Sequence, residues 1–533
     1  ANRLALEAIG VLRVLEAELK AQDLTREIRN TAAIANVLAG RPRDALKLLN
    51  AASLDQDVDA RLWRAIARAE SQDYRGARFD AIEARAVADS YPEWVRNHFR
   101  LAAARAAVEA GDPDLAQRML DSIDFAGLSV EDASLHHLLA GRIDEAAGRN
   151  QEALDTYGQV IASDIRPTRA EAVYRTLLLL DGEGRLDLDK ATQTLSAETM
   201  LWRGDALEAE MQALLAQLYF RNGDYRLGFE TVKAAVANYP ESPAVNALRD
   251  QAQAMFSDLF LNGVADSISP IESMAIYYDF QHLTPPGARG DEMIRNLARR
   301  LVRVDLLAQA AELLQYQLDN RLRGVARTQI ASDLAVIYLA DRKPQEAMRV
   351  LNDTQLPGLP ESLQRQRRIL EARAMIDGGR DQLALDLISN MDGKDVELLR
   401  IDAHWKARRY SQAGEMIESV YGNAPPGQPL NLVARMNLIK AAVGYVLSSD
   451  DFGLSRLRAK FGEKMVASPE WPMFDYVTGP IQTSSLEFKR VAAEIAAVDS
   501  LAAFLSSYRE TYAGEGALTP LKASAVSAAV ASL

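Results

Sequence analysis

The feature that most constrains this chain is an internal repeat of two short helices joined by a turn. Two copies are clear, one from Leu138 to Pro167 and one from Ala213 to Pro240. Each predicts a first helix with small and large apolar residues, a turn that contains glycine, and a second helix that ends near proline. Repeats of about 20 to 50 residues decide the fold before any other pattern does.

Six looser copies keep the same order of helix, turn and helix. Antiparallel helices approach closely only where one presents Ala or Gly to a large residue of the other, and each pair leaves an apolar face that the next pair covers. We therefore predict an all-α fold, an α-solenoid or superhelix of antiparallel helix pairs. The small residues that mark the looser copies are Gly40, Ala77, Gly111, Ala347, Gly379 and Ala413.

The clearest copy carries Gly223, Tyr225, Gly228 and Pro240 at the turn, at the start of the second helix, within it and after it. In this respect the chain resembles the tetratricopeptide-repeat (TPR) superfamily. The resemblance covers most of residues 25–420. It implies a scaffold that binds other proteins.

The repeat pattern fails between residues 257 and 291, where two consecutive prolines precede Gly287. Such a sequence ends a helix, so we predict a joint between two solenoids here. An aromatic cluster in this joint is interpreted either as packing or as an exposed binding element. The cluster is Tyr277, Tyr278 and Phe280. The predicted division is residues 1–256 for an N-terminal TPR-like solenoid, 257–291 for the joint, 292–467 for a C-terminal solenoid, 468–512 for capping helices and 513–533 for an Ala/Ser-rich tail.

Near the C-terminus, apolar residues recur at helical spacing from Phe488 to Leu505, with charged residues between them. The pattern predicts an amphipathic helix or helical pair. We interpret it as a cap, because the terminal repeat of a solenoid needs an outer lid. A helix that binds a partner is the alternative.

The formal net charge of −13 argues against a nucleic-acid-binding surface, which would need a basic face. The arginines between Arg295 and Arg303 are interpreted as a solvated helix face. The chain has no cysteine, which excludes disulfides and thiolate metal sites. No apolar run is long enough for a membrane-spanning helix.

No catalytic or cofactor motif is present. The five histidines are widely spread without a metal-ligand spacing, and no phosphate-binding loop or nucleophile elbow occurs. Several Glu-Ser dipeptides are compatible with the general acid of lytic transglycosylases, but the rest of that family's motif is missing. We predict no enzyme activity, no cofactor and no metal.

The predicted function is a scaffold that holds a peptide or a helix of a partner protein in a groove lined by first helices. The acidic balance favours a basic or neutral ligand. The predicted partner-binding residues are Tyr219, Arg221, Asn222 and His404, together with Tyr277, Tyr278 and Phe280 from the joint.

The absence of cysteine is frequent in exported bacterial proteins, and the chain begins with Ala1-Asn2-Arg3, as expected if an upstream segment has been removed. Its Ala-, Arg- and Leu-rich composition and the C-terminal stretch from Glu487 to Arg509 resemble large exported TPR proteins of alphaproteobacteria. The resemblance implies a periplasmic scaffold in an envelope assembly. A cytoplasmic assembly adaptor and a cell-wall glycan-cleaving enzyme are the alternatives.

Overall fold

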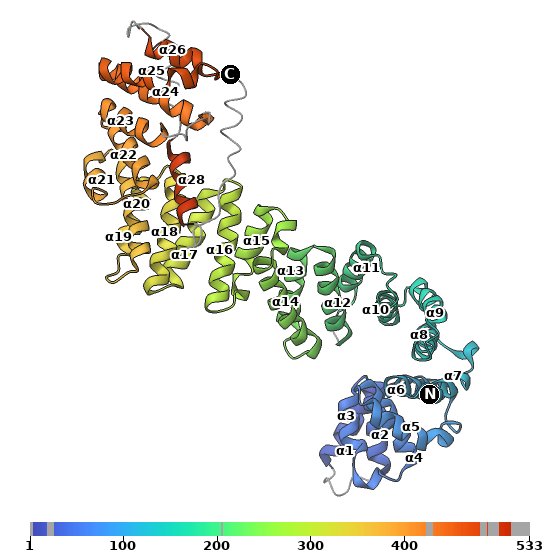
Figure 1. Cartoon of the computed structure of the whole chain (residues 1–533). Helices are drawn as coiled ribbons and strands as arrows, with labels where there is room; N and C mark the ends of the chain where they lie inside the picture. The colour runs from blue at the N-terminus through green and yellow to red at the C-terminus, as the bar shows by residue number, and fades with distance from the viewer. Residues whose placement is uncertain are drawn as a thin grey trace. The chain divides into compact units, whose positions relative to one another are not determined.

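The computed structural model describes residues 4–18, 26–203, 206–422, 430–479, 488 and 500–512 (Figure 1). Over these ranges the regular structure consists of α-helices and short 3₁₀ helices, without a strand. The predicted all-α solenoid of helix pairs is confirmed. The chain divides into two compact units, Ala1–Ala252 (unit 1) and Gln253–Leu533 (unit 2), and the boundary falls inside α14 (Pro243–Leu261).

Unit 1 begins with α1 (Ala5–Glu18), after which a first and a second helix alternate and pack against each other. Two 3₁₀ helices, η1 (Ala52–Leu54) and η2 (Phe125–Gly127), lie in the connections between pairs. The pairs are α2 (Arg26–Leu38) with α3 (Pro42–Leu49), α4 (Val58–Glu70) with α5 (Tyr74–Ala88), α6 (Glu93–Glu109) with α7 (Pro113–Asp121), α8 (Val130–Ala146) with α9 (Asn150–Ser163), α10 (Arg166–Gly182) with α11 (Leu188–Leu201), and α12 (Ala206–Asn222) with α13 (Tyr225–Asn238).

Unit 2 repeats this alternation after an irregular start. Its first elements are η3 (Val264–Ser267), α15 (Pro270–Asp279) and η4 (Gln281–Leu283), which occupy the segment predicted as a joint. The pairs are α16 (Ala288–Arg303) with α17 (Leu307–Asn320), α18 (Gly324–Ala340) with α19 (Pro344–Asp353), α20 (Glu361–Asp377) with α21 (Asp381–Leu387), α22 (Lys394–Lys406) with α23 (Tyr410–Tyr421), and α24 (Leu432–Leu447) with α25 (Asp451–Met465); α26 (Trp471–Thr478) and α28 (Ser500–Tyr512) follow.

Each turn inside these pairs contains one residue with a left-handed backbone conformation, with φ between +57° and +87°. This residue, called the turn residue below, reverses the chain direction within a few positions. Glycine adopts the conformation without a steric penalty, whereas other residues lose about 1–2 kcal/mol. The turn residues are Gly40, Gln72, Gly111, Gly148, Gly184 and Gly223 in unit 1, and Asp305, Arg342, Gly379, Arg408 and Ser449 in unit 2.

Small residues at the helix crossings are structural, as predicted. A Cβ added to Gly141 of α8 would lie 2.6 Å from the buried ring of Tyr157 on α9, and one added to Gly228 of α13 would lie 2.5 Å from the ring of Phe220 on α12. Such distances are too short for carbon atoms. Glycine at these positions therefore lets the two helices of a pair approach over an aromatic side chain.

In five pairs an arginine on the first helix ties the pair to the one before it. Its guanidinium donates to a carbonyl at the C-terminal end of the preceding second helix, where the last carbonyls have no partner within their own helix. The donor and acceptor residues are Arg64 and Leu49, Arg169 and Ile161, Arg327 and Leu318, Arg367 and Leu351, and Arg400 and Ile388.

The interpretation of the arginines in α16 as a solvated face is wrong for Arg300. This side chain is buried and donates to Ser273 Oγ at 3.0 Å and to the carbonyl of Ile268. It therefore joins α16 to α15 and to the end of η3.

The two helices of the predicted cap lie in different places. α26 packs against α24 and α25, the last pair along the described chain, whereas α28 packs against α22. The predicted tail, residues 513–533, lies outside the described residues. So do residues 489–499, where the amphipathic helix was expected to begin.

Candidate functional site

The first helices of successive pairs share a face that can be indexed by sequence distance from the turn residue. In unit 1, Arg105 and Arg142 lie six residues before the turn residues of their pairs, whereas Glu171 and Glu210 lie thirteen residues before theirs. Because positions seven apart in a helix point almost the same way, positions six and thirteen belong to one face. We call it the inner face.

A buried ion-pair network organises the inner face of unit 1. Glu171 on α10 accepts from Arg105 on α6 at 2.7 Å and from Arg142 on α8 at 2.7 Å, and Arg142 also donates to Glu109 at 2.8 Å. Burial alone would raise the pKa of the Glu171 carboxyl, but the two guanidinium groups outweigh it and hold this pKa below its usual range. Three consecutive first helices are therefore joined through one carboxylate.

A second group of contacts extends the network. The hydroxyl of Tyr157 donates to Glu145 at 2.6 Å, and Arg175 lies 3.5 Å from the same carboxylate. Burial, together with the nearby Glu210 carboxylate to which its hydroxyl donates, raises the pKa of Tyr174 to about 12. These tyrosines stay protonated at neutral pH and act as hydrogen-bond donors.

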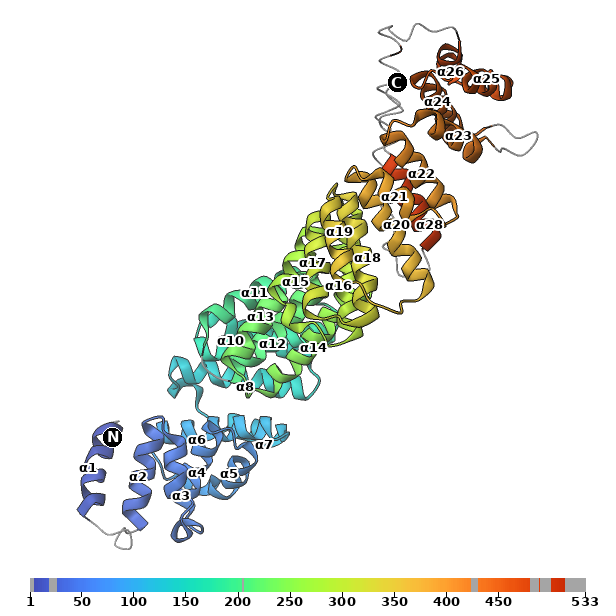
Figure 2. The ribbon, with the colours of Figure 1, turned by 90° about the vertical axis from the view of Figure 1, so that its left-hand side faces the viewer.

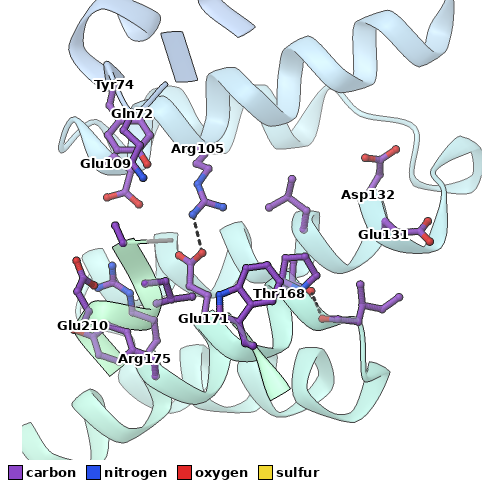
Figure 3. Close-up of a pocket in the computed structure, with 17 residues that line it drawn as sticks. Gln72, Tyr74, Arg105, Glu109, Glu131, Asp132, Thr168, Glu171, Arg175 and Glu210 are labelled. Atoms are coloured by element: carbon purple, nitrogen blue, oxygen red, sulfur yellow. Dashed lines mark hydrogen bonds and ion pairs between the residues drawn. The ribbon is translucent and has the colours of Figure 1, made fainter. Parts of the chain in front are cut away.

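Above this network lies a hollow of about 460 Å³, which Figure 3 shows with Arg105 and Glu171 at its centre. It is lined from α6, α8, α10 and α12 and from the start of α5. Its apolar and aromatic lining includes Tyr74, Leu135, Pro167, Tyr174, Trp202 and Leu207.

The charge of the hollow is unbalanced. Two arginines line it, Arg105 and Arg175, against five carboxylates, which are Glu109, Glu131, Asp132, Glu171 and Glu210. Glu109 and Glu171 are neutralised by the arginines of the network. The other three have no cation within ion-pair distance among the described residues.

The environments of these three carboxylates differ. Asp132 accepts from the Ser129 hydroxyl at 2.9 Å, and Glu210 accepts from Tyr174. Glu131 is exposed and has no hydrogen-bond or ion-pair partner in the described part of the chain. Burial raises the pKa of the Glu210 carboxyl, although Arg175 partly opposes this effect. The hollow therefore combines uncompensated negative charge with apolar surface, which suits a cationic side chain flanked by apolar ones.

None of the seven predicted partner-binding residues lines this hollow. At the end of α12, Tyr219 packs against the apolar core, Arg221 forms an ion pair with Asp181 at 2.7 Å, and Asn222 donates to Asp189 at 3.1 Å. Arg221 and Asn222 thus hold the turn of their own pair against the preceding one.

The predicted residues of unit 2 also lie apart. Tyr277 and Phe280 are buried, and Tyr277 stacks on Phe256 with ring centroids 6.3 Å apart. Buried rings do not offer a binding surface, so the binding role predicted for these two is corrected to packing at the joint. Tyr278 is 37% exposed. His404 lies in the last turn of α22, where burial lowers the pKa of its imidazole.

The residues of the hollow were not predicted from the sequence, because the predicted binding residues of unit 1 lie beside a glycine turn. Counting back from the turn residues does not find them either. Six residues before the turn residue, the other pairs of unit 1 have Ile34, Ile66, Leu178 or Gln217 in place of the arginines.

Two further observations bear on function. In the part of the chain that the structure describes, no cluster of three or more His, Cys, Asp or Glu side chains is arranged to hold a metal ion. Among the described helices, none combines the length and the apolar character needed to cross a membrane.

No model of a known protein family matches the chain, and no curated protein matches it in sequence. Among solved structures, the pentatricopeptide repeat protein PPR10 from maize matches 96% of this chain and 71% of its own at 14% identity and a TM-score of 0.29. Human IFIT1, solved as a dimer with PPP-AAAA, matches 93% and 95% at 15% identity and 0.26. The Cut9–Hcn1 hetero-tetramer of APC/C matches 96% and 89% at 12% identity and 0.24. At these values the fold assignment depends on the chain's own helix pairs and turns.

Proposed function

We propose that this protein is a non-catalytic interaction scaffold that binds a peptide or a helix of a partner protein on the inner face of unit 1. The hollow, with three carboxylates that form no ion pair among the described residues, is the observation that carries the proposal; they are Glu131, Asp132 and Glu210. A Lys or Arg side chain of the ligand would be attracted by these carboxylates, while its apolar neighbours would cover Trp202 and Leu207.

We further propose that the partner belongs to a bacterial envelope assembly and that the scaffold works in the periplasm. The support is the sequence character described above, namely the lack of cysteine and the resemblance to exported TPR proteins. Fractionation of the native cells, with detection of the protein in periplasmic and cytoplasmic fractions, tests this part. Recovery in the cytoplasmic fraction alone would favour the adaptor alternative.

The binding proposal is tested by selecting ligands from a random peptide library with the full chain and measuring their affinity by fluorescence polarisation. Peptides with one or more Lys or Arg next to Leu or aromatic residues are expected to be enriched. The triple variant Glu131→Gln, Asp132→Asn, Glu210→Gln is expected to bind them about tenfold more weakly, as the loss of about 1.4 kcal/mol of attraction implies.

A matched control removes the same number of carboxylates from exposed positions on second helices. Asp114→Asn, Glu152→Gln and Asp155→Asn, on α7 and α9, lower the negative charge equally without touching the hollow. This control is expected to keep at least half of the affinity. A selection without basic residues, or equal losses in both variants, would contradict the proposal.

A further inference from the structure

The inner face of unit 2 is covered by α28, the last helix among the described residues. Arg373 lies six residues before Gly379, the turn residue of its pair, and Asp395 lies thirteen residues before Arg408. They occupy the positions that Arg105 and Glu171 occupy in unit 1. In unit 2, α28 lies along this face beside α20 and α22, as Figures 1 and 2 both show.

The contacts of α28 with this face are made by aromatic residues. The guanidinium of Arg373 lies 5.3 Å from the centroid of the Phe504 ring. The hydroxyl of Tyr512 accepts from Arg365 Nε at 3.2 Å and donates to Asp395 Oδ2 at 3.3 Å. Cation–π contacts and buried tyrosine hydrogen bonds are specific in geometry, so the face selects the spacing of these rings.

That spacing is regular. Phe504, Tyr508 and Tyr512 follow each other at intervals of four residues and are all at most 4% exposed. Leu501 and Leu505 are buried beside them, whereas Ala502, Ser506 and Glu510 are exposed. α28 thus presents one apolar and aromatic stripe to the inner face, the arrangement by which an amphipathic helix binds in a groove.

One residue of α28, Arg509, opposes its docking. Arg509 is buried, its Nε has no hydrogen-bond partner, and no carboxylate forms an ion pair with it among the described residues. Burial without such a partner lowers the pKa of its guanidinium. Among the described residues nothing offsets the burial of this guanidinium, and such burial costs free energy that is recovered when the helix leaves the surface.

We propose that α28 is a detachable internal ligand of unit 2, and that the inner face formed by α20 and α22 accepts a partner helix with aromatic residues at positions i, i+4 and i+8. The partner helix would place its rings where Phe504, Tyr508 and Tyr512 lie, and α28 would have to leave first. This inference extends the proposed function to a second binding face and to a helical ligand class.

The experiment uses the full chain and a fluorescein-labelled peptide with the sequence of residues 500–512 as the probe. The wild-type chain is expected not to bind the probe, because its own α28 competes at a high effective concentration. The double variant Phe504→Ala, Tyr508→Ala is expected to release α28 and to bind the probe at least tenfold more tightly than the wild type. A peptide carrying the same two alanines should not bind.

The same contacts provide a test of where the probe binds, together with matched control variants. Adding Arg365→Met to the double variant is expected to weaken probe binding at least threefold. The variant Ser506→Ala, Glu510→Ala changes only the exposed side of α28, so α28 should stay docked and the probe should not bind. The triple carboxylate variant of unit 1 should not change probe binding. Failure of this inference is therefore distinguishable from failure of the proposed function.

A second measurement covers the case in which the double variant does not fold. In hydrogen exchange of the wild type, amides of α28 are expected to exchange at least tenfold faster than those of α22, as required of a helix that opens on its own. Equal protection of the two helices, or a folded double variant that does not bind the probe, would overturn the proposal. A wild-type dimer that dissociates on Phe504→Ala, Tyr508→Ala would overturn the internal assignment and identify a second copy as the source of the helix.

Discussion

The inner faces of unit 1 and unit 2 are built from equivalent positions of the same kind of helix, yet one is open and the other is covered. In unit 1 these positions hold Arg105 and Glu171, and three carboxylates without an ion pair among the described residues line the hollow beside them. In unit 2 they hold Arg373 and Asp395, and α28 lies over them. The comparison teaches that the backbone supplies a similar surface in both units. The side chains six and thirteen residues before the turn residue, and those around them, decide what binds there.

The largest expected effect concerns the network that shapes the open face. Glu171→Ala leaves the guanidinium groups of Arg105 and Arg142 without their shared carboxylate, and should lower the free energy of unfolding by about 3 kcal/mol. Urea denaturation followed by circular dichroism measures it. Glu152→Ala on the exposed surface of α9 is the control and should change the value by less than about 0.5 kcal/mol. Equal effects would mean that the network does not organise the face.

The next prediction concerns the covered face of unit 2 and has the opposite sign, because the substitution should stabilise the contact. Arg509→Met removes a buried guanidinium that has no ion-pair partner among the described residues and keeps an apolar stem, so it should strengthen the docking of α28 by about 1–2 kcal/mol. Hydrogen exchange of the α28 amides should slow accordingly. Faster exchange in this variant would show that the guanidinium has a favourable partner.

A smaller loss is expected from the tyrosine at the end of α28. Tyr512→Phe removes the hydroxyl that Arg365 and Asp395 share, and should weaken docking by about 1 kcal/mol. Burial raises the pKa of Tyr512 to about 12. Because the protonated form is favoured in the folded state, this contribution is present below pH 10 and is lost as the pH rises from about 10 to 12. The variant should lack this part of the pH dependence in alkaline titrations.

The turn residues separate the two units in another way. Unit 1 uses glycine at all of its turns within pairs except at Gln72, whereas unit 2 uses it only at Gly379. Ser449→Gly should therefore stabilise unit 2 by about 0.5–1 kcal/mol, since glycine adopts φ of +57° without strain. Gly223→Ala in unit 1 should destabilise by about 1 kcal/mol. Thermal unfolding of both variants checks these two predictions. Shifts of the unfolding temperature in the same direction would contradict them.

The smallest effect concerns the pH dependence of ligand binding on the open face. Because burial raises the pKa of Glu210, this carboxyl gains a proton at a higher pH than an ordinary glutamate and then no longer attracts a cation. The affinity for a basic peptide should therefore begin to fall at a higher pH than an ordinary glutamate would cause, and Glu210→Gln should flatten this part of the curve. A steeper curve in the variant would assign the titration to another group.

The sequence predicted the fold through the turns. Glycine followed by tyrosine or aspartate between apolar segments, as at Gly223, indicates both the pair and its period. The pairs with Arg342 or Arg408 as the turn residue were found only through their helices, because side chains other than glycine carry no such signal. The pairs with Asp305 or Ser449 were not among the predicted copies. The hollow was not predicted, since Arg105, Glu171 and Glu210 come from separate repeats. Only the register of one repeat against the next brings them together.

The sequence pattern did not predict the position of α28 either. Its amphipathic stripe indicates that it covers an apolar surface, but periodicity does not say which one. A cap on the last pair and a ligand on an earlier pair need the same spacing of apolar residues. The distinguishing contacts, from Arg365 and Arg373 on α20, lie more than a hundred residues earlier in the chain.

The arginine ties between pairs have a direction, and this direction matters while the chain is being synthesised. In each tie a guanidinium from a later first helix reaches back to a carbonyl of the earlier second helix, as Arg169 does to Ile161 and Arg400 to Ile388. A pair that has just left the ribosome therefore keeps its final carbonyls in water until the next helix emerges. The pairs tied in this way are completed by their successors, which gives these parts of the nascent chain an order of maturation from the N-terminus onward.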